Sequence, residues 1–242
     1  MCVIAIAWQA HPRWRLVVAA NRDEYHDRPA EKLHRWPDSD LIAGRDLIGR
    51  GTWLAVSEQG RFAAVTNLRQ QRQQPADPEW TSRGLLVTGL ALGQQQYEGA
   101  AIDRLAGFGP FQAISVSGAE ADLLSNRPTP ACRRLAPGIL GISNGPFDRP
   151  WRKSRRLGSM VERWLNDATF DRASLLADLR DPASPAADAD DPGEIFVSDP
   201  VYGTRCSTVV TVDQSGDGVI VEVRYDRAGN VEGTETIAFR WP

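Results

Sequence analysis

The stretch CVIAIAW, residues 2–8, lies at the start of the chain and is the segment that most constrains the fold. It is apolar at every position and rich in β-branched residues, which is typical of a strand buried on both faces. Residues 9–13 include Pro12 and predict a short turn, and WRLVVAAN, residues 14–21, predicts a second strand. The two strands together predict a buried hairpin, so residues 21–24 should lie beside the amino terminus.

The rest of the chain continues with hairpins and a few helices. Residues 52–56 and 61–67 predict a second hairpin, and a crossing rich in proline and charge, residues 25–50, separates it from the first. The clearest helix is residues 151–166, in which apolar side chains recur every three or four positions along one face. This stripe consists of Leu157, Met160, Val161, Trp164 and Leu165. Further helices are predicted at 82–93, 97–106 and 171–179, a loop at 181–193, and strands at 111–117, 121–125, 138–143, 206–212, 218–225 and 234–240.

Strands joined as hairpins, without regular βαβ alternation, indicate an α+β protein with mainly antiparallel sheets. No segment has the composition of a linker between two domains, so residues 1–242 are expected to form one domain. A chain of this length buries roughly 70% or more of its unfolded surface, which is enough for a sizeable core.

The composition excludes several classes of function. Lysine and arginine number 28 against 31 aspartate and glutamate, a formal net charge of −3, whereas nucleic-acid binders carry a clustered basic excess. No stretch approaches the ~18–20 apolar residues of a membrane span, and residues 2–8 lack the preceding basic residue of a signal peptide. The three cysteines lie far apart and include no CxxC pair, which favours a reducing, cytoplasmic setting.

Only three histidines occur, His11, His26 and His34, and none follows position 34. The motif GISNG, residues 141–145, matches the G-x-S-x-G nucleophile elbow of α/β-hydrolases, but that triad requires a histidine after the serine. Ser143 is therefore excluded as such a nucleophile, and a glycine-flanked turn is the preferred interpretation. The histidines lack metal-ligand spacing and no dinucleotide fingerprint is present, so neither a metal nor an organic cofactor is predicted.

Cys2 offers nucleophilic chemistry that needs no histidine. Removal of the initiator Met1 would leave a thiol and a free α-amine on one residue, and an α-amine with its ordinary pKa of about 7.7–8.0 accepts a proton near neutral pH. An N-terminal nucleophile activated by its own amine is an established arrangement. The alternative is that Cys2 is a small buried residue opening a core strand, since free cysteine is among the most buried residue types.

Polar residues at the end of the second strand are the next candidates. In NRDE, residues 21–24, strand alternation places Asn21 and Asp23 on one face and Arg22 on the other. A carboxylate at Asp23 would hold the α-amine and orient the thiol. Asn21 and Arg22 are expected to contact the substrate. The alternative for all of them is a solvated strand end.

Two later clusters stand at strand ends in the same way. Asn67 and Asn144 are candidate amide donors to a developing oxyanion, a role worth a few kcal/mol per donor. Arg205 is a candidate cation for a substrate carboxylate or for lowering a thiol pKa. Turn chemistry, which asparagine and glycine favour, is the alternative for these positions.

These motifs keep a fixed order along nearly the whole chain. They are Met1-Cys2, Asn21–Glu24, Ala43–Asp46, Gly51–Leu54, Thr66-Asn67, Ser143–Gly145 and Tyr202–Thr208. In them the chain resembles the NRDE family, the family of the transport-and-Golgi-organisation protein 2, which has many bacterial members. That family is in turn similar to the N-terminal-nucleophile (Ntn) hydrolases with an N-terminal cysteine, such as the bile-salt and penicillin amidases. The resemblance implies a four-layer αββα sandwich of antiparallel sheets.

The resemblance also implies roles for the candidate residues. Cys2 would be the nucleophile, Asp23 would hold its α-amine, Asn67 and Asn144 would form or support the oxyanion hole, and Arg205 would match the later active-site arginine. The amidases carry a further arginine two or three positions before the aspartate, where this chain has Ala20 and Asn21.

Two functions are consistent with these residues. The first is a Cys-type Ntn amidohydrolase that acts on a linear amide or a related acyl compound. The second is a non-catalytic binding or trafficking protein that holds a small apolar or haem-like ligand in the same fold, an alternative that the missing arginine motivates. In both cases the expected partner is a small molecule and not a nucleic acid, and the substrate and the oligomeric state stay open.

Overall fold

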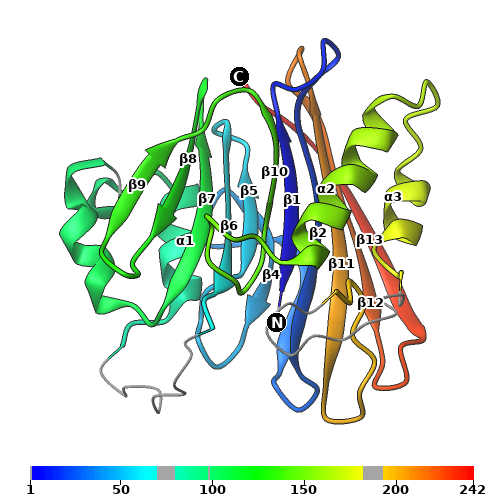
Figure 1. Cartoon of the computed structure of the whole chain (residues 1–242), viewed down its shortest axis with the longest axis horizontal. Coiled ribbons are helices and arrows are strands. Elements are labelled where there is room, and N and C mark those ends of the chain that lie inside the picture. Colours follow the sequence, from blue (N-terminus) through cyan, green and yellow to red (C-terminus); the bar gives the residue numbers. More distant parts are fainter. Residues whose placement is uncertain (1, 70–79, 98, 182–192) are drawn as a thin grey trace. The chain divides into compact units, whose positions relative to one another are not determined.

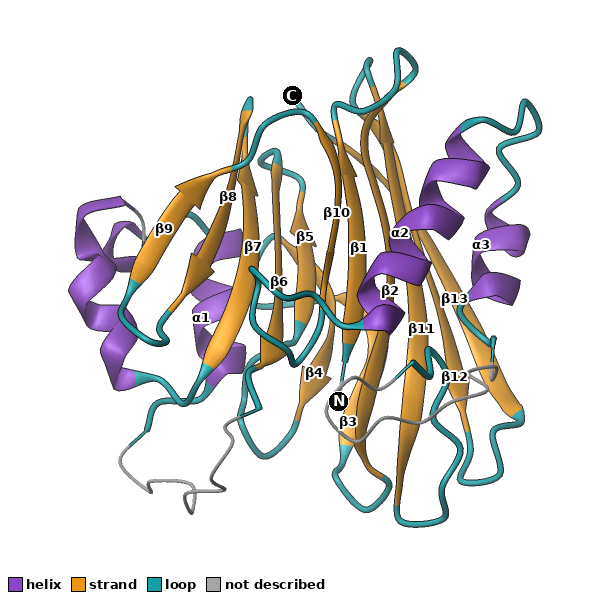
Figure 2. Cartoon of the chain, in the orientation of Figure 1, coloured by secondary structure: helices purple, strands orange, loops and turns teal. Residues whose placement is uncertain are grey.

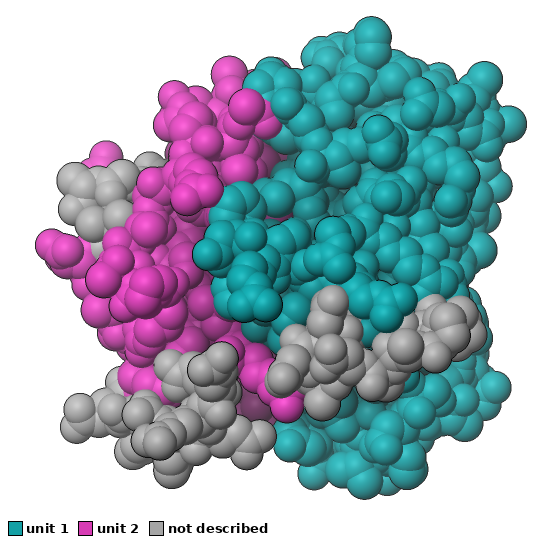
Figure 3. Space-filling model, in the orientation of Figure 1, with its two compact units in different colours: residues 1–27, 137–239 teal, residues 28–136, 240–242 magenta. Residues whose placement is uncertain are grey.

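A computed structural model gives the structure of the chain and describes residues 2–69, 80–97, 99–181 and 193–242 (Figures 1 and 2). The chain forms two compact units, which Figure 3 colours separately. Unit 1 comprises residues 1–27 and 137–239, and unit 2 comprises residues 28–136 and 240–242. The described residues of each unit build one antiparallel sheet with helices on one face, so the predicted α+β class is confirmed. The expectation of a single domain stays a prediction.

The sheet of unit 1 has six strands in the order β10-β1-β2-β11-β12-β13. They are β1 (Val3–Trp8), β2 (Trp14–Tyr25), β10 (Gly138–Ile142), β11 (Tyr202–Asp213), β12 (Asp217–Tyr225) and β13 (Val231–Arg240). The predicted hairpin is confirmed, because β1 and β2 pair antiparallel with Val3 opposite Asn21. Every residue of β1 is buried, as its unbroken apolar sequence indicates.

Two helices pack on one face of this sheet, α2 (Arg152–Leu165) and α3 (Arg172–Asp178) (Figure 1). The apolar stripe of α2 packs against side chains that β1 and β2 direct to that face, among them Val3, Ala5 and Ala19. The small alanine side chains let the helix approach the sheet closely. Gly141 in β10 extends this approach, because a Cβ atom there would lie 2.2 Å from the backbone oxygen of Ser154. The first turn of α2 therefore lies directly against the backbone of β10.

The sheet of unit 2 is a seven-stranded meander in which each strand pairs with its neighbours in the sequence. Its strands are β3 (Ala30–Arg35), β4 (Leu41–Asp46), β5 (Leu54–Ser57), β6 (Arg61–Asn67), β7 (Phe111–Ser117), β8 (Glu120–Ser125) and β9 (Ala131–Arg134). Helix α1 (Arg83–Ala91) packs on one face and is followed by the 3₁₀ segments η1 (Gln95–Tyr97) and η2 (Gly99–Gly107). No helix within the described ranges is long and apolar enough to cross a membrane.

Unit 2 departs from the sequence-based expectations in several elements. The sequence predicts no strand within residues 25–50, yet β3 and β4 lie there, and β9 is also unexpected. β3 and β9 are the two edge strands of the sheet. In β3 only Leu33 is buried, and all of β9 is exposed, so neither shows the apolar alternation that predicts a strand. The helix predicted at 97–106 is replaced by 3₁₀ turns at residue 97 and at residues 99–106, and residue 98 lies outside the described residues. Most of the predicted loop at 181–193 also lies outside them.

Candidate active site

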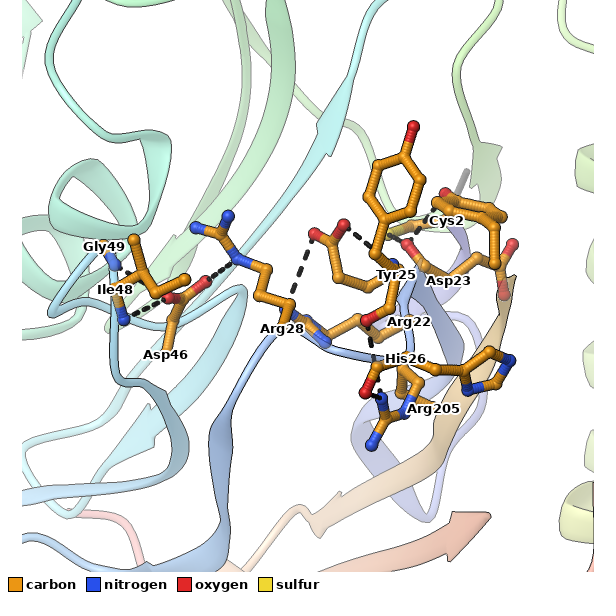
Figure 4. Close-up of polar contacts among 12 residues, drawn as sticks. Cys2, Arg22, Asp23, Tyr25, His26, Arg28, Asp46, Ile48, Gly49 and Arg205 are labelled. Atoms are coloured by element: carbon orange, nitrogen blue, oxygen red, sulfur yellow. Dashed lines mark hydrogen bonds and ion pairs between the residues drawn. The ribbon is translucent and has the colours of Figure 1, made fainter. Parts of the chain in front are cut away.

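The hairpin of β1 and β2 brings the start of the chain to one end of the unit 1 sheet. Cys2 immediately precedes β1, whose first residue, Val3, lies opposite Asn21 of β2. The thiol of Cys2 donates to the backbone oxygen of Asp23, with a distance of 3.9 Å between Sγ and the oxygen (Figure 4). The structure thus brings together Cys2 and Asp23, two of the residues predicted to form the site.

The carboxyl group of Asp23 lies in the interior and is held from β11. Thr204 stands opposite Asp23 in the pairing of β2 with β11, and its hydroxyl donates to Oδ1 at 2.7 Å. The hydroxyl of Tyr202 donates to the backbone oxygen of Asp23 at 2.9 Å, so this oxygen accepts from both Tyr202 and Cys2. The motif that opens β11 therefore contributes two side chains whose roles are not evident from the sequence.

A lysine from α2 completes the surroundings of Asp23. Nζ of Lys153 lies 4.0 Å from Oδ2 of Asp23, and the exposed fractions of the two side chains are 1% and 0%. Lys153 belongs to the first turn of α2, the turn that Gly141 allows against the sheet, and its Nζ lies 5.8 Å from the ring centroid of Trp151. None of the sequence motifs points to Lys153. The one available signal is its place four residues before Leu157, at the amino-terminal end of the apolar stripe.

Burial is the largest cause of the pKa shifts of Cys2, Asp23 and Lys153. It raises the pKa of the Asp23 carboxyl, against the opposing effects of the Lys153 charge and the hydrogen bond from Thr204. It lowers the pKa of Lys153, an effect that the charge of Asp23 counteracts. Burial also raises the pKa of the Cys2 thiol, and the negative charge of Asp23 raises it further. The thiol is therefore protonated at neutral pH, and nucleophilic attack by Cys2 requires a base.

Asn21, which is expected to contact substrate, is placed in the hydrogen-bonded interior of unit 1. Its Nδ2 group donates to the backbone oxygens of Leu179 and Ile195 at 2.8 and 2.9 Å. Its Oδ1 accepts from the hydroxyl of Ser207 at 2.6 Å, and the hydroxyl of Tyr225 donates to that of Ser207 at 3.0 Å. Asn21 thus ties β2 to β11 and to the segment that follows α3, which is a structural role.

The two arginines predicted for the site lie on β2 and β11. Arg22 is largely buried and forms an ion pair with Glu24, with 3.6 Å between Nη2 and Oε2. Arg205 stands at a shift of register in the pairing of β2 with β11, and its Nη1 donates to the backbone oxygen of His26 at 2.5 Å. Figure 4 shows its guanidinium group turned toward His26 and not toward Cys2. The bulge thus directs Arg205 to the turn after β2, and its catalytic role stays a prediction.

The two asparagines expected to donate to an oxyanion belong to different units. Asn144 is buried in unit 1. In the antiparallel pairing of β1 with β10, Ile4 lies opposite Ile142; Cys2 precedes Ile4 by two residues, and Asn144 follows Ile142 by two. It therefore lies at the same end of the sheet as the thiol. Asn67 is the last residue of β6 in unit 2, where it is exposed.

Ser143 of the GISNG motif has a structural environment. Its hydroxyl accepts a hydrogen bond from that of Ser154 at 2.8 Å, and both side chains are buried. The bond joins the end of β10 to the first turn of α2, close to the contact at Gly141. This environment agrees with the exclusion of Ser143 as an elbow nucleophile.

A cavity of about 850 Å³ lies in unit 1 between β10 and α2, with Ile139, Phe147 and Arg155 in its wall. Neither Cys2 nor Asp23 lines it, so this cavity is separate from the cysteine site. Within the described parts of the chain, no group of three His, Cys, Asp or Glu side chains could hold a metal ion.

Comparison of the sequence with known proteins identifies relatives over almost its full length. The model of the family described as Transport and Golgi organisation 2 matches residues 1–227. The Transport and Golgi organization protein 2 homologue of Homo sapiens is 30% identical over 263 residues, and that of Bos taurus is 32% identical over 260 residues. Each alignment covers 92% of this chain and 92% of the relative. These matches confirm the family that the motifs predict.

Comparison of the structure finds solved hydrolases of similar fold. Penicillin V acylase from Agrobacterium tumefaciens aligns with a TM-score of 0.53 and 12% identity, over 92% of this chain and 83% of that chain. The C2A mutant of conjugated bile acid hydrolase from Clostridium perfringens aligns with a TM-score of 0.52 and 8% identity, over 100% and 97% of the two chains. Identity this low shows the fold alone, and the fold is the predicted one, that of the Ntn hydrolases.

Proposed function

Because the chain belongs to the Transport and Golgi organisation 2 family and has the Ntn-hydrolase fold, we propose that it is a Cys-type N-terminal-nucleophile amidohydrolase. Its substrate is a linear amide or a related acyl compound. The observation that supports this most is the buried carboxyl of Asp23 next to Cys2, whose thiol lies 3.9 Å from the Asp23 backbone oxygen. Such a carboxyl can hold a first-residue amine beside its own thiol, as an N-terminal nucleophile requires.

The proposed reaction begins with removal of Met1, which frees the α-amine of Cys2. The amine takes the thiol proton, and the sulfur attacks the carbonyl carbon of the amide to form a tetrahedral oxyanion. Collapse of this intermediate breaks the C–N bond, and the α-ammonium group gives its proton to the departing amine. A water molecule, deprotonated by the same α-amine, then attacks the thioester and releases a carboxylic acid and the free thiol.

Neighbouring residues support these steps in the proposal. Asp23 accepts a hydrogen bond from the α-amino group while Thr204 fixes its Oδ1. Asn144, at the same end of the sheet as Cys2, donates to the oxyanion. The oxyanion role of Asn67 stays a prediction from the sequence.

The test compares turnover by the Cys2→Ala variant with turnover by Cys132→Ala, a matched control because Cys132 is an exposed free cysteine. The substrates are a panel of N-acyl amines and N-acyl amino acids that includes penicillin V. We expect C2A to lower kcat/KM by about 10³-fold or more, and C132A to stay within about two-fold of wild type because surface substitutions have small effects. Intact mass should show that the active protein lacks Met1 and gains one acyl group on Cys2.

Two results would contradict this function. One is turnover that is unchanged in C2A. The other is full turnover by protein whose intact mass still includes Met1, because the α-amine of Cys2 is then blocked.

A second function is favoured by the raised pKa of the Cys2 thiol and by the names of the relatives, which refer to transport and not to hydrolysis. In this case the chain binds a small apolar or haem-like ligand without catalysis. Titration with haemin, followed by absorbance, distinguishes the two functions. Haemin binding that C2A leaves unchanged, in protein without amide turnover, supports the second function, and binding that is lost in C2A contradicts it.

A further inference from the structure

Lys153 occupies a position that its own helix does not favour. A cation in the first turn of a helix faces the positive end of the helix dipole, and a buried ammonium group loses its hydration. The side chain of Lys153 is only 1% exposed, and the first turn of α2 contains no acidic residue that would offset the charge. The placement of this lysine is therefore explained by its contact outside the helix.

That contact is with Asp23. The 4.0 Å between Nζ of Lys153 and Oδ2 of Asp23 exceeds the ~2.8 Å of a direct charge-assisted hydrogen bond, so the two groups interact as an ion pair across a short gap. The other carboxyl oxygen of Asp23 accepts from Thr204 at 2.7 Å. Removing one partner of such a buried pair leaves the other charge uncompensated. Within the pair, each charge favours the ionised form of its partner and opposes the effect of burial, which favours the neutral form.

We propose that Lys153 is a positioning residue of this site: its ammonium group keeps Asp23 ionised beside Cys2, so that the carboxylate can hold the α-amine. This inference rests on the proposed function of Cys2 as an N-terminal nucleophile. The cation reaches the carboxylate from α2, whereas the amidase pattern places an arginine on the strand, where this chain has Ala20 and Asn21.

Other charged groups also act on this pair. Asp23 and Cys2 act on Lys153, as does Glu194, an exposed residue in the segment before β11. Lys153, the amino-terminal charge and Arg22 act on Asp23. Arg22 also acts on the Cys2 thiol. Arg22 and Glu194 are unchanged in every variant proposed below, so differences among the variants report on Lys153 and Asp23.

The experiment measures how the rate of Cys2 alkylation by iodoacetamide depends on pH, with the modified peptide resolved by mass. It requires no substrate, so its result is independent of amide turnover. Lys153→Met removes the charge at similar length, and Lys153→Arg keeps it. Lys32→Met is the matched control, because Lys32 is the other lysine of the chain and is exposed. Asp23→Asn and the double variant D23N/K153M complete the set.

The expected signs follow from the charge that each variant leaves beside the thiol. In the alkaline range in which the buried thiol titrates, Asp23 is ionised in K153M but has lost its cation, so this variant should raise the midpoint of Cys2 alkylation by about one pH unit. D23N leaves the lysine unbalanced and should lower the midpoint by about the same amount. The double variant, in which both groups are neutral, should return to within about 0.3 pH units of wild type, and K153R and K32M should not change the midpoint.

The proposal is overturned if the midpoints of D23N and wild type agree, or if the double variant keeps the shift of either single variant. These two comparisons decide the question even if K153M does not fold, because neither of them uses that variant. Turnover gives a separate result: K153M should be at least about ten-fold slower at neutral pH, with recovery in K153R. Alkylation shifts of the expected signs in a protein without turnover support the ion pair and contradict the proposed hydrolase function, whereas turnover without the shifts contradicts the role of Lys153 alone.

Discussion

The Asn21→Ala variant tests whether this residue holds unit 1 together or serves the substrate. The change removes the donations to the backbone oxygens of Leu179 and Ile195, at 2.8 and 2.9 Å, and the 2.6 Å bond from Ser207. Each hydrogen bond contributes about 1 kcal/mol net, and a buried partner left unsatisfied costs about 1–3 kcal/mol. Asn21 is 0% exposed, so water cannot readily replace its amide. We therefore expect N21A to lower the free energy of unfolding by about 3–5 kcal/mol.

A loss of this size is a large fraction of the roughly 5–15 kcal/mol that stabilises a typical domain, so it is readily measured. The assay is urea unfolding followed by tryptophan fluorescence. The matched control is Asn166→Ala, because Asn166 is exposed and its amide makes one bond, at 2.9 Å, to the backbone oxygen of Glu162. We expect this control to change the free energy of unfolding by less than about 0.5 kcal/mol.

Equally small losses of stability in N21A and in the control would show that Asn21 does not hold unit 1 together. Weaker substrate affinity in a fully stable N21A protein would instead support the substrate contact that the sequence predicts. The same unfolding data therefore decide between the two roles of Asn21.

Two further predictions concern a close approach in unit 1 and a carboxyl group in unit 2. Gly141→Ala places a methyl group 2.2 Å from a backbone oxygen of α2 and should lower the free energy of unfolding in urea by roughly 1–3 kcal/mol. The control is Gly233→Ala, whose new Cβ has no described atom within 4 Å, and it should lower the free energy of unfolding by less than about 0.5 kcal/mol. Equal losses in both variants would show that α2 does not lie against β10 at Gly141. Burial alone would raise the pKa of Asp46, but hydrogen bonds from Arg28 and two backbone N–H groups lower it below its ordinary value of 3.8 (Figure 4). A carboxyl group whose pKa is lowered on folding stabilises the fold at pH values above its pKa in the unfolded chain, and this stabilisation is lost as the pH falls. Wild type should therefore be about 1 kcal/mol more stable than Asp46→Asn at pH 7, and this difference should disappear below about pH 4. A gap that is the same at pH 3 and pH 7 would contradict this account.

The part of the site on the first hairpin could be predicted from the sequence. The first hairpin consists of two apolar runs joined by a short turn. Only one pairing register of the two strands buries the apolar side chains of both. That register places Asp23 beside the start of the chain, where it meets Cys2. The motif at the start of β11 also lies on the strand that pairs with β2, but the sequence singles out Arg205 in it and gives no sign of the hydrogen bond from Thr204 to Asp23.

The rest of the site depends on packing that leaves little trace in the sequence. Lys153 and Asp23 are far apart in the chain, and their contact requires α2 to cross the sheet at Gly141. A lysine in an arginine-rich helix is ordinarily solvated, so only its alignment with the apolar stripe indicates burial. The direction of Arg205 depends on a shift of register in β11, and such a bulge has no clear signature in the residues around it.

The two segments of unit 1 are separated in the chain by residues 28–136, and this order has a consequence for how the proposed nucleophile is made. Lys153 and Thr204 follow Cys2 by more than 100 residues in the chain, so both leave the ribosome after it. At about 5–20 residues per second, Lys153 is synthesised roughly 8–30 s after Cys2. During this interval the first hairpin has neither β11 beside it nor α2 packed on it. Synthesis of α2 and then of β11 supplies Lys153 and Thr204, so the surroundings of Asp23 beside Cys2 are complete only when β11 has been made.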